Sequence, residues 1–113
     1  PMVCMFVALI DGEIVGFFSV MHAGTGRSAH VAEFGVAIRK SCWHLGIGAM
    51  AMVLSIDFAR EAGYHKLVLC ARADNERAIA LYRRFGFEQT GVRRDQLFIR
   101  GEYFDEIMME LML

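Results

Sequence analysis

The sequence has a single proline, only three cysteines and no marked excess of charge of either sign. Its 12 basic and 13 acidic residues leave a formal net charge of −1, so the basic face that nucleic-acid binding normally needs is not indicated. No apolar run in the sequence reaches the roughly 20 residues that a membrane-spanning helix requires. Cys4, Cys42 and Cys70 match no zinc-binding spacing, so we expect free thiols in a reducing cytoplasm and no metal site.

The chain does contain enough apolar material for a core. Hydrophobic residues make up 56% of its 113 positions, and this length is close to that of one common domain. No repeat, low-complexity segment or linker divides the sequence, so we expect one domain over residues 1–113. The apolar start of the chain lacks the basic lead-in and the small-residue cleavage site of a signal peptide, so we interpret it as a strand. The sequence starts abruptly on a proline, so we expect this domain to be N-terminally incomplete.

The first third of the chain has the pattern of an antiparallel meander. Apolar residues dominate residues 3–10 and 13–21, and the Asp-Gly pair between them is a strong signal for a two-residue hairpin turn. A third strand is predicted at 29–38. Over residues 46–62 the apolar spacing changes to i, i+3 and i+4, which predicts a helix.

The second half of the chain alternates strands and helices. We expect a strand at 66–71, a helix at 75–85, and strands at 87–94 and 103–112. The predicted order, β-β-β-α-β-α-β-β, defines an α+β fold with a mixed, mostly antiparallel sheet and two crossover helices. Ligands of open sheets favour the point where the strand direction switches, beyond the carboxyl ends of the strands.

The stretch WHLGIGAM, at residues 43–50, follows the third predicted strand and opens the first predicted helix. A helix N-terminus offers unpaired N–H groups and the positive end of the helix dipole, which suit a phosphate group. Glycine at positions 46 and 48 removes side chains that would keep a phosphate away from these N–H groups. The alternative is an ordinary glycine-containing turn between a loop and a helix, and no Gly-Lys-Ser/Thr follows that would indicate a Walker loop.

The stretch ADNERAIALYRRFGF, at residues 73–87, carries the second set of candidate residues. Asp74 or Asn75 can cap the second predicted helix. Asn75 lies at its start, and Tyr82 lies seven residues on, two turns away on nearly the same face. One helix face therefore presents an amide and a phenol in line. The alternative is an asparagine that only caps the helix and a tyrosine that only fills the core.

Together these motifs resemble the GNAT superfamily of acyl-CoA-dependent N-acyltransferases. VAEFGVAIRKSCWHLGIGAMAM is similar to the family's strand, pyrophosphate loop (Arg/Gln-x-x-Gly-x-Gly/Ala) and helix, with Trp43 in place of the first Arg or Gln. DNERAIALYRRFGFEQTG is similar to the family's Asn-x-x-Ala-x-x-x-Tyr-x-x-x-Gly-Phe stretch, and GEYFDEIMMEL to its last strand. The resemblance covers residues 29–113, and it implies that the family's first strand and first two helices would precede residue 1.

The resemblance also implies a role for individual residues. Asn75 would bond the pantetheine arm of acetyl-CoA, and Tyr82 would protonate the leaving thiolate. Further coenzyme contacts would come from the strand backbone at Val36 and Ile38, and from pyrophosphate-binding N–H groups at Leu45, Gly46, Ile47, Gly48 and Ala49. Apart from the resemblance, Arg39, Lys40 and His44 are near enough in the sequence to supply positive charge.

Glu33 is the candidate base. A primary amine has a pKa of about 10 and must lose a proton to attack a thioester, and a carboxylate can accept that proton directly or through water. Glu33 lies mid-strand among apolar neighbours, where a carboxylate is expected to be paired or functional. In many members of the family an acidic residue at this place is the proposed base. The alternative is a strand glutamate that faces solvent or pairs with an arginine across the sheet.

We therefore predict a cytoplasmic, homodimeric N-acetyltransferase that moves an acetyl group from acetyl-CoA to a primary amine of a small molecule or a protein N-terminus. The alternative is a catalytically silent acyl-CoA-binding module that acts as a sensor or partner domain. The Asn75–Tyr82 pair favours the enzyme, and Trp43 favours the silent module. We expect no metal, nucleic-acid or membrane partner.

Overall fold

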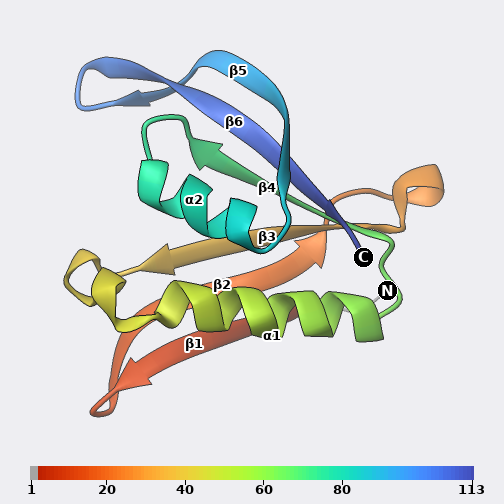
Figure 1. Cartoon of the computed structure of the whole chain (residues 1–113), viewed down its shortest axis with the longest axis horizontal. Helices are drawn as coiled ribbons and strands as arrows, with labels where there is room; N and C mark the ends of the chain where they lie inside the picture. Colours follow the sequence, from red (N-terminus) through yellow and green to blue (C-terminus); the bar gives the residue numbers. More distant parts are fainter. Residues whose placement is uncertain (1–2) are drawn as a thin grey trace. The chain divides into compact units, whose positions relative to one another are not determined.

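A computed structural model describes residues 3–113 of the chain (Figure 1). Its elements are β1 Cys4–Ile10, β2 Glu13–His22, η1 Gly26–Ser28, β3 Val31–Ile38, η2 Lys40–Leu45, α1 Ile47–Glu61, β4 Lys66–Arg72, α2 Glu76–Arg84, β5 Glu88–Ile99 and β6 Glu102–Met112, where η denotes a 3-10 helix. Strands and α-helices follow the predicted order, so the predicted α+β class is confirmed. Among residues 3–113, no helix combines the length and the apolar character that a membrane crossing needs.

The strands follow one another across the sheet in the order β1-β2-β3-β4-β6-β5. The pairs β1–β2, β2–β3 and β5–β6 are antiparallel. The chain divides into two compact units, one that runs up to Leu67 and includes Met112–Leu113, and one that comprises Val68–Leu111. Strand β4 begins in the first unit and continues in the second.

Apart from the short 3-10 helix η1, where no element was predicted, and shifts of one or two residues at element ends, the structure departs from the predicted bounds in two places. Residues 40–45, for which no element was predicted, form the 3-10 helix η2. The strand predicted at 87–94 continues to Ile99 because β5 keeps pairing with β6 beyond a register shift between Arg93 and Leu97. Extra residues on one strand bulge out of a ladder without ending it, and the apolar pattern alone does not reveal such a continuation.

In the first unit, α1 packs against β2 and β3. The predicted Asp-Gly turn is confirmed, because Asp11 and Gly12 have φ values of 51° and 80°, as a tight hairpin between β1 and β2 requires. Val20 of β2 and Met52 of α1 are fully buried in the core of this unit. The core therefore lies on the α1 side of the meander.

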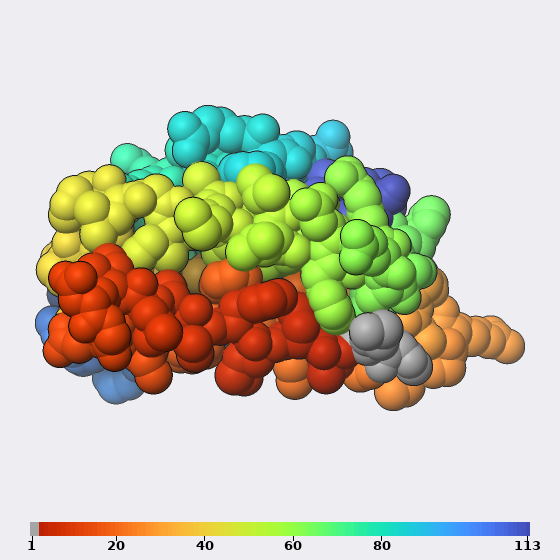
Figure 2. Space-filling model, turned by 90° about the horizontal axis from the view of Figure 1, so that it is seen from below, coloured from red at the N-terminus to blue at the C-terminus, as the bar shows by residue number. Residues whose placement is uncertain are grey.

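The other face of the meander carries exposed apolar side chains. Met5, Val7 and Leu9 of β1 and Phe17 of β2 are 46–66% exposed, and they alternate with more buried neighbours, as side chains on the two faces of a strand do. Figure 2 shows atoms of β1, in red, beside those of η2 and α1, in yellow and green. An exposed apolar edge strand is prone to pair with another chain.

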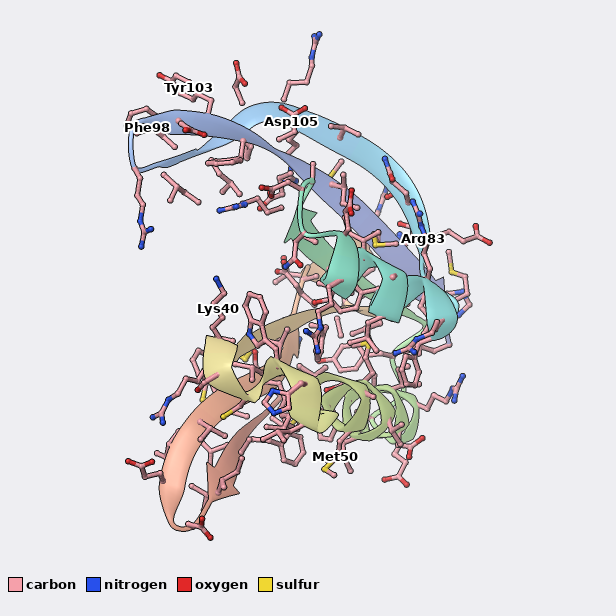
Figure 3. All side chains as sticks on the ribbon, turned by 60° about the vertical axis from the view of Figure 1, so that its left-hand side comes forward. Lys40, Met50, Arg83, Phe98, Tyr103 and Asp105 are labelled. Atoms are coloured by element: carbon pink, nitrogen blue, oxygen red, sulfur yellow. The ribbon has the colours of Figure 1, made fainter. Side chains whose placement is uncertain are left out.

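In the second unit, α2 buries Ile79 and Tyr82. The tail predicted at 103–112 is a strand and not a helix, and it pairs with β5 through a turn at Arg100 and Gly101, whose φ values are 51° and 81°. Near the end of this hairpin, Phe98 and Tyr103 face each other across the strands with ring centroids 4.8 Å apart (Figure 3).

Candidate active site

The N-terminus of α1 is the first candidate element. Gly46 is its N-cap, with φ 77° and ψ 10°, a left-handed conformation that glycine adopts without strain. The first helical hydrogen bond runs from the Met50 N–H to the Gly46 carbonyl over 3.1 Å, so the helix offers no carbonyl to the N–H groups of Ile47, Gly48 and Ala49. Within residues 3–113 no side chain caps this end, and its first turn has no acidic residue. The arrangement suits an anion.

The basic side chains near this helix end differ in their availability. Arg39 is engaged elsewhere, because its Nη1 lies 3.6 Å from the Glu13 carboxylate. The Lys40 ammonium lies 5.9 Å from the centre of the Trp43 ring, at the start of η2 (Figure 3). His44 lies in the last turn of η2 and is exposed. His44 is thus the basic side chain nearest in sequence to the α1 N-terminus, and its proposed role stays a prediction.

Trp43 has a structural contact that accounts for its place in the loop. Its Nε1–H donates a hydrogen bond of 2.8 Å to the Ile38 carbonyl, while the side chain is 42% exposed. The indole therefore ties η2 back to the end of β3. At this position the family's pattern has a basic or amide side chain, and here the side chain binds the chain's own backbone.

Three predicted site residues lie on β3. Val36 and Ile38 are half-buried on the same face as Phe34, whereas Glu33 is exposed on the other face, with Met21 as its partner on β2. Within residues 3–113 the Glu33 carboxylate forms no hydrogen bond or ion pair. Of the two alternatives to a catalytic Glu33, the structure therefore matches the solvent-facing one and not the arginine pair.

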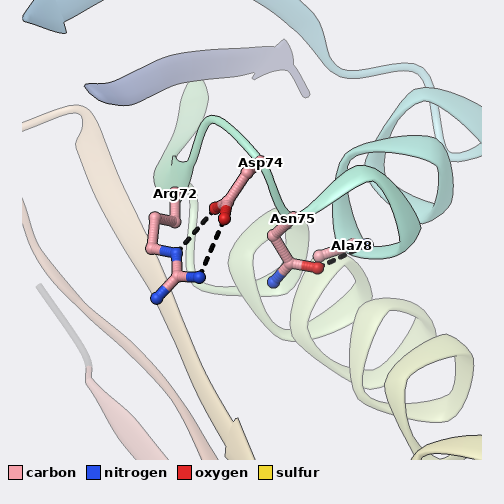
Figure 4. Close-up of polar contacts among 4 residues, drawn as sticks. All are labelled: Arg72, Asp74, Asn75 and Ala78. Atoms are coloured by element: carbon pink, nitrogen blue, oxygen red, sulfur yellow. Dashed lines mark hydrogen bonds and ion pairs between the residues drawn. The ribbon is translucent and has the colours of Figure 1, made fainter. Parts of the chain in front are cut away.

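Asn75 is the N-cap of α2, one of the two caps that the sequence pattern allowed. Its Oδ1 accepts a hydrogen bond of 3.3 Å from the Ala78 N–H (Figure 4). The cap uses only the oxygen of the amide, and within residues 3–113 the Nδ2 group has no hydrogen-bond partner. The capping interpretation is therefore correct, and it leaves the donor end of the side chain for a ligand.

Tyr82 lies on the buried side of α2. The residue is 6% exposed, and its ring centroid is 6.1 Å from that of Phe87. Burial raises the pKa of the phenol above its usual value, so Tyr82 carries its proton at neutral pH. A neutral phenol is both a core residue and a possible proton donor, so burial by itself does not decide between the two roles.

Sequence reasoning missed one cluster in the second unit. Arg72, at the end of β4, binds Asp74 through two hydrogen bonds and lies over the Phe104 ring of β6. The available signal was a basic and an acidic residue two positions apart, directly before a helix cap. Phe104 lies too far along the chain for any local pattern to connect it to them.

Within each unit, the predicted residues are grouped by the elements that carry them. In the first unit, η2 joins the half-buried end of β3 to the uncapped start of α1. In the second, Asn75 and Tyr82 share α2, with the buried Ile79 between them. A six-stranded sheet with these two helix starts is the arrangement that the resemblance to acyl-CoA-dependent N-acyltransferases implies.

Comparison with known proteins agrees with this class. The family model described as the acetyltransferase (GNAT) family matches residues 1–87, and the chain belongs to this family. An L-amino acid N-acetyltransferase from Escherichia coli (strain K12) is 29% identical over 110 residues, which are 96% of this chain and 68% of that protein. The spermidine N(1)-acetyltransferase of the same strain is 32% identical over 108 residues, which are 92% of this chain and 55% of that protein.

The fold is likewise shared with solved structures. The crystal structure of a GNAT superfamily phosphinothricin acetyltransferase from Sinorhizobium meliloti, in complex with acetyl-CoA, superposes with a TM-score of 0.87 at 21% sequence identity. The match covers 96% of this chain and 60% of that one. The chain thus spans about half to two thirds of the length of these relatives.

Proposed function

We propose that this protein transfers an acetyl group from acetyl-CoA to a primary amine. The observation that carries the proposal is the α1 N-terminus, where a left-handed Gly46 opens a helix without a side-chain cap and without an acidic residue in its first turn. Such an end suits a pyrophosphate. In our proposal the backbone N–H groups of Leu45–Ala49 bind the coenzyme's pyrophosphate, and the exposed side chain of His44 contacts it.

The remaining coenzyme contacts follow from the other predicted residues. Asn75 donates its Nδ2–H to the pantetheine arm, which agrees with an Oδ1 already engaged at the helix cap. Val36 and Ile38 contribute backbone groups. Their side chains are half-buried, so each residue can pack in the core while its backbone binds the coenzyme.

The proposed chemistry is direct attack. The amine nitrogen attacks the thioester carbonyl carbon while Glu33 takes the amine proton, directly or through water. Strand N–H groups near Val36 stabilise the oxyanion of the tetrahedral intermediate. When the carbon–sulfur bond breaks, the Tyr82 hydroxyl protonates the departing thiolate, and its raised pKa agrees with a proton held until that moment.

The acceptor class is a small amine or a protein N-terminus. According to their names, the relatives described above act on an amino acid and on a polyamine. Both acceptors carry a primary amine, so the names support this chemical group and not one particular acceptor. We further propose that residues 1–113 work as one domain, in the cytoplasm and as a homodimer. Within residues 3–113 the three cysteines form no disulfide, which supports the reducing compartment, and the exposed apolar side chains of β1 support the dimer.

One observation favours a second candidate function, a catalytically silent acyl-CoA-binding module. Trp43 replaces a residue of the family's pyrophosphate loop, and its indole N–H is bound to the Ile38 carbonyl. A module of this kind would bind acetyl-CoA without needing an acid for the leaving group.

A panel of amines tests the proposal. The protein is incubated with acetyl-CoA and, separately, with amino acids, polyamines and peptides that have a free N-terminus, while free CoA thiol is measured. We expect acceptor-dependent release of CoA with at least one class. Binding of acetyl-CoA without acetylation of any class would instead support the silent module, and absence of binding would contradict both functions.

The pH dependence of the rate tests Glu33. Glu33→Gln is expected to slow acetylation about 10²-fold at neutral pH and to recover much of that loss at high pH, where an amine with a pKa of about 10 loses its proton unaided. Affinity for acetyl-CoA should stay close to that of the wild type. Glu88→Gln, another exposed strand glutamate, is the matched control. Parallel pH profiles for Glu33→Gln and the wild type would remove Glu33 from the mechanism.

A further inference from the structure

Hydrogen bonds of both the backbone and the side chains stabilise the turn between β4 and α2. The Asn75 N–H donates to the Arg72 carbonyl over 2.9 Å and closes the turn, while the Ala73 N–H donates to the Asp105 carbonyl of β6 over 2.8 Å. Asn75 therefore enters α2 from a segment that is anchored to the neighbouring strand.

Side chains reinforce this turn through a two-point ion pair. Arg72 Nε donates to Asp74 Oδ1 over 2.6 Å, and Arg72 Nη2 donates to Asp74 Oδ2 over 2.8 Å (Figure 4). The hydrogen bonds from Arg72 lower the pKa of the Asp74 carboxyl, so the pair is fully ionised at neutral pH. The two side chains are 38% and 50% exposed, and an ion pair with that exposure contributes little to global stability.

A third contact connects this pair to the sheet. The guanidinium carbon of Arg72 lies 4.1 Å from the centre of the Phe104 ring, a distance at which a cation and an aromatic face attract each other. Arg72 therefore links Asp74, one residue before the α2 cap, to strand β6. An ion pair that contributes little to stability but is fixed by two hydrogen bonds and a ring contact calls for a local explanation.

We propose that Arg72 and Asp74 are positioning residues, which orient Asn75 so that its Nδ2 group meets the acyl-coenzyme arm. The Oδ1 of Asn75 is held by the Ala78 N–H, so the direction of Nδ2 depends on how the turn presents the residue. This inference rests on the proposed function, because the coenzyme is the ligand that Asn75 would meet.

Calorimetric titration of the protein with acetyl-CoA tests the inference without an acceptor amine. Arg72→Met removes the guanidinium but keeps an apolar stem over Phe104, and it is expected to weaken acetyl-CoA binding about five- to tenfold. Arg72→Lys keeps the positive charge but not the two-point hydrogen bonding, so its affinity for acetyl-CoA should lie between those of the wild type and Arg72→Met. Arg83→Met, which removes another exposed arginine of the same unit, is the matched control and should leave the affinity unchanged.

A double substitution separates positioning from a direct contact. Asn75→Ser keeps an oxygen that caps the helix but removes the amide donor, and it should weaken binding by a similar factor. In the Asn75→Ser variant, adding Arg72→Met should not weaken acetyl-CoA binding further, because the Asn75 amide that Arg72 positions is already absent.

Three results would overturn the inference. They are an unchanged affinity in Arg72→Met, an equal loss from Arg72→Met with and without Asn75→Ser, and equal losses in Arg72→Met and Arg83→Met. Each of these leaves acetyl-CoA binding by the wild type intact and thus leaves the proposed function standing. Absence of binding by the wild type would overturn both.

Discussion

Replacing Tyr82 with phenylalanine is expected to lower kcat about 10²–10⁴-fold while KM for acetyl-CoA stays within about twofold of the wild type. The substitution removes only the hydroxyl. The buried ring keeps its contact with Phe87, so packing of the second unit is preserved. A group that protonates the leaving thiolate acts when the carbon–sulfur bond breaks, so its loss affects the chemical step and not coenzyme binding.

The direction of the Tyr82 pKa shift adds a pH criterion. Burial disfavours the phenolate and raises the pKa above the usual value of about 10 for a tyrosine. The acid form is therefore present throughout the neutral and mildly alkaline range, and loss of rate through deprotonation of Tyr82 should occur at a higher pH than for an ordinary tyrosine. A wild-type rate that falls between pH 8 and 9 would point to a different group.

Tyr64→Phe is the matched control for this substitution. Tyr64 is also 6% exposed, and its hydroxyl lies 3.2 Å from His22 Nδ1. Its loss costs one hydrogen bond in the first unit and is expected to leave kcat unchanged. If Tyr82→Phe and Tyr64→Phe behave alike in steady-state kinetics, Tyr82 is a core residue only.

Gly48→Val is expected to abolish the rise in melting temperature that acetyl-CoA produces in the wild type. A ligand that binds only the folded state stabilises it by mass action, so a saturating coenzyme raises the melting temperature. Gly48 lies in the first turn of α1, where the backbone N–H groups have no helical carbonyl partner, because the first helical hydrogen bond is donated by Met50. A branched side chain there would obstruct the approach of a pyrophosphate.

Gly48→Ala is the small-residue control for this test. Alanine favours a helix over glycine by up to about 1 kcal/mol, so the free protein should melt at a slightly higher temperature than the wild type. The shift caused by acetyl-CoA should be kept, because the family's loop pattern has glycine or alanine at this position.

Met50→Val controls for the branched side chain. Met50 is 64% exposed in α1, two residues after Gly48, and lies outside the proposed pyrophosphate loop (Figure 3). The substitution introduces the same branched side chain two residues further along the helix and should preserve the full acetyl-CoA shift. A Gly48→Val variant that folds and keeps that full shift would contradict pyrophosphate binding at this helix end.

Local patterns in the sequence were sufficient for most of the elements. The Asp11-Gly12 turn, the 3.6-residue spacing of α1 and the Asn75 cap each depend on residues within about four positions of one another. Interactions over such short separations are dictated by the residues themselves. The fold class and the residues at both helix starts could therefore be predicted, and their functional roles stay predictions.

The exposure of Glu33 could not be predicted with the same certainty. Alternation along a strand separates its two faces, but the sequence does not say which face an arginine from another strand will share. The structure places Glu33 on the exposed face opposite Met21, with no arginine partner within residues 3–113. The pairing register between β2 and β3 decided that Met21, and not an arginine, is the partner of Glu33.

The sequence by itself determined the order of strands and helices and the two residues, Gly46 and Asn75, that begin the helices. Only the tertiary structure decided that Trp43 binds the Ile38 carbonyl, that β5 runs on to Ile99, and that Arg72 lies over Phe104. The physical reason is the distance along the chain between the residues that interact. Helix caps and turns arise from neighbouring residues, whereas these contacts depend on how a loop folds back and on which residues of two strands pair.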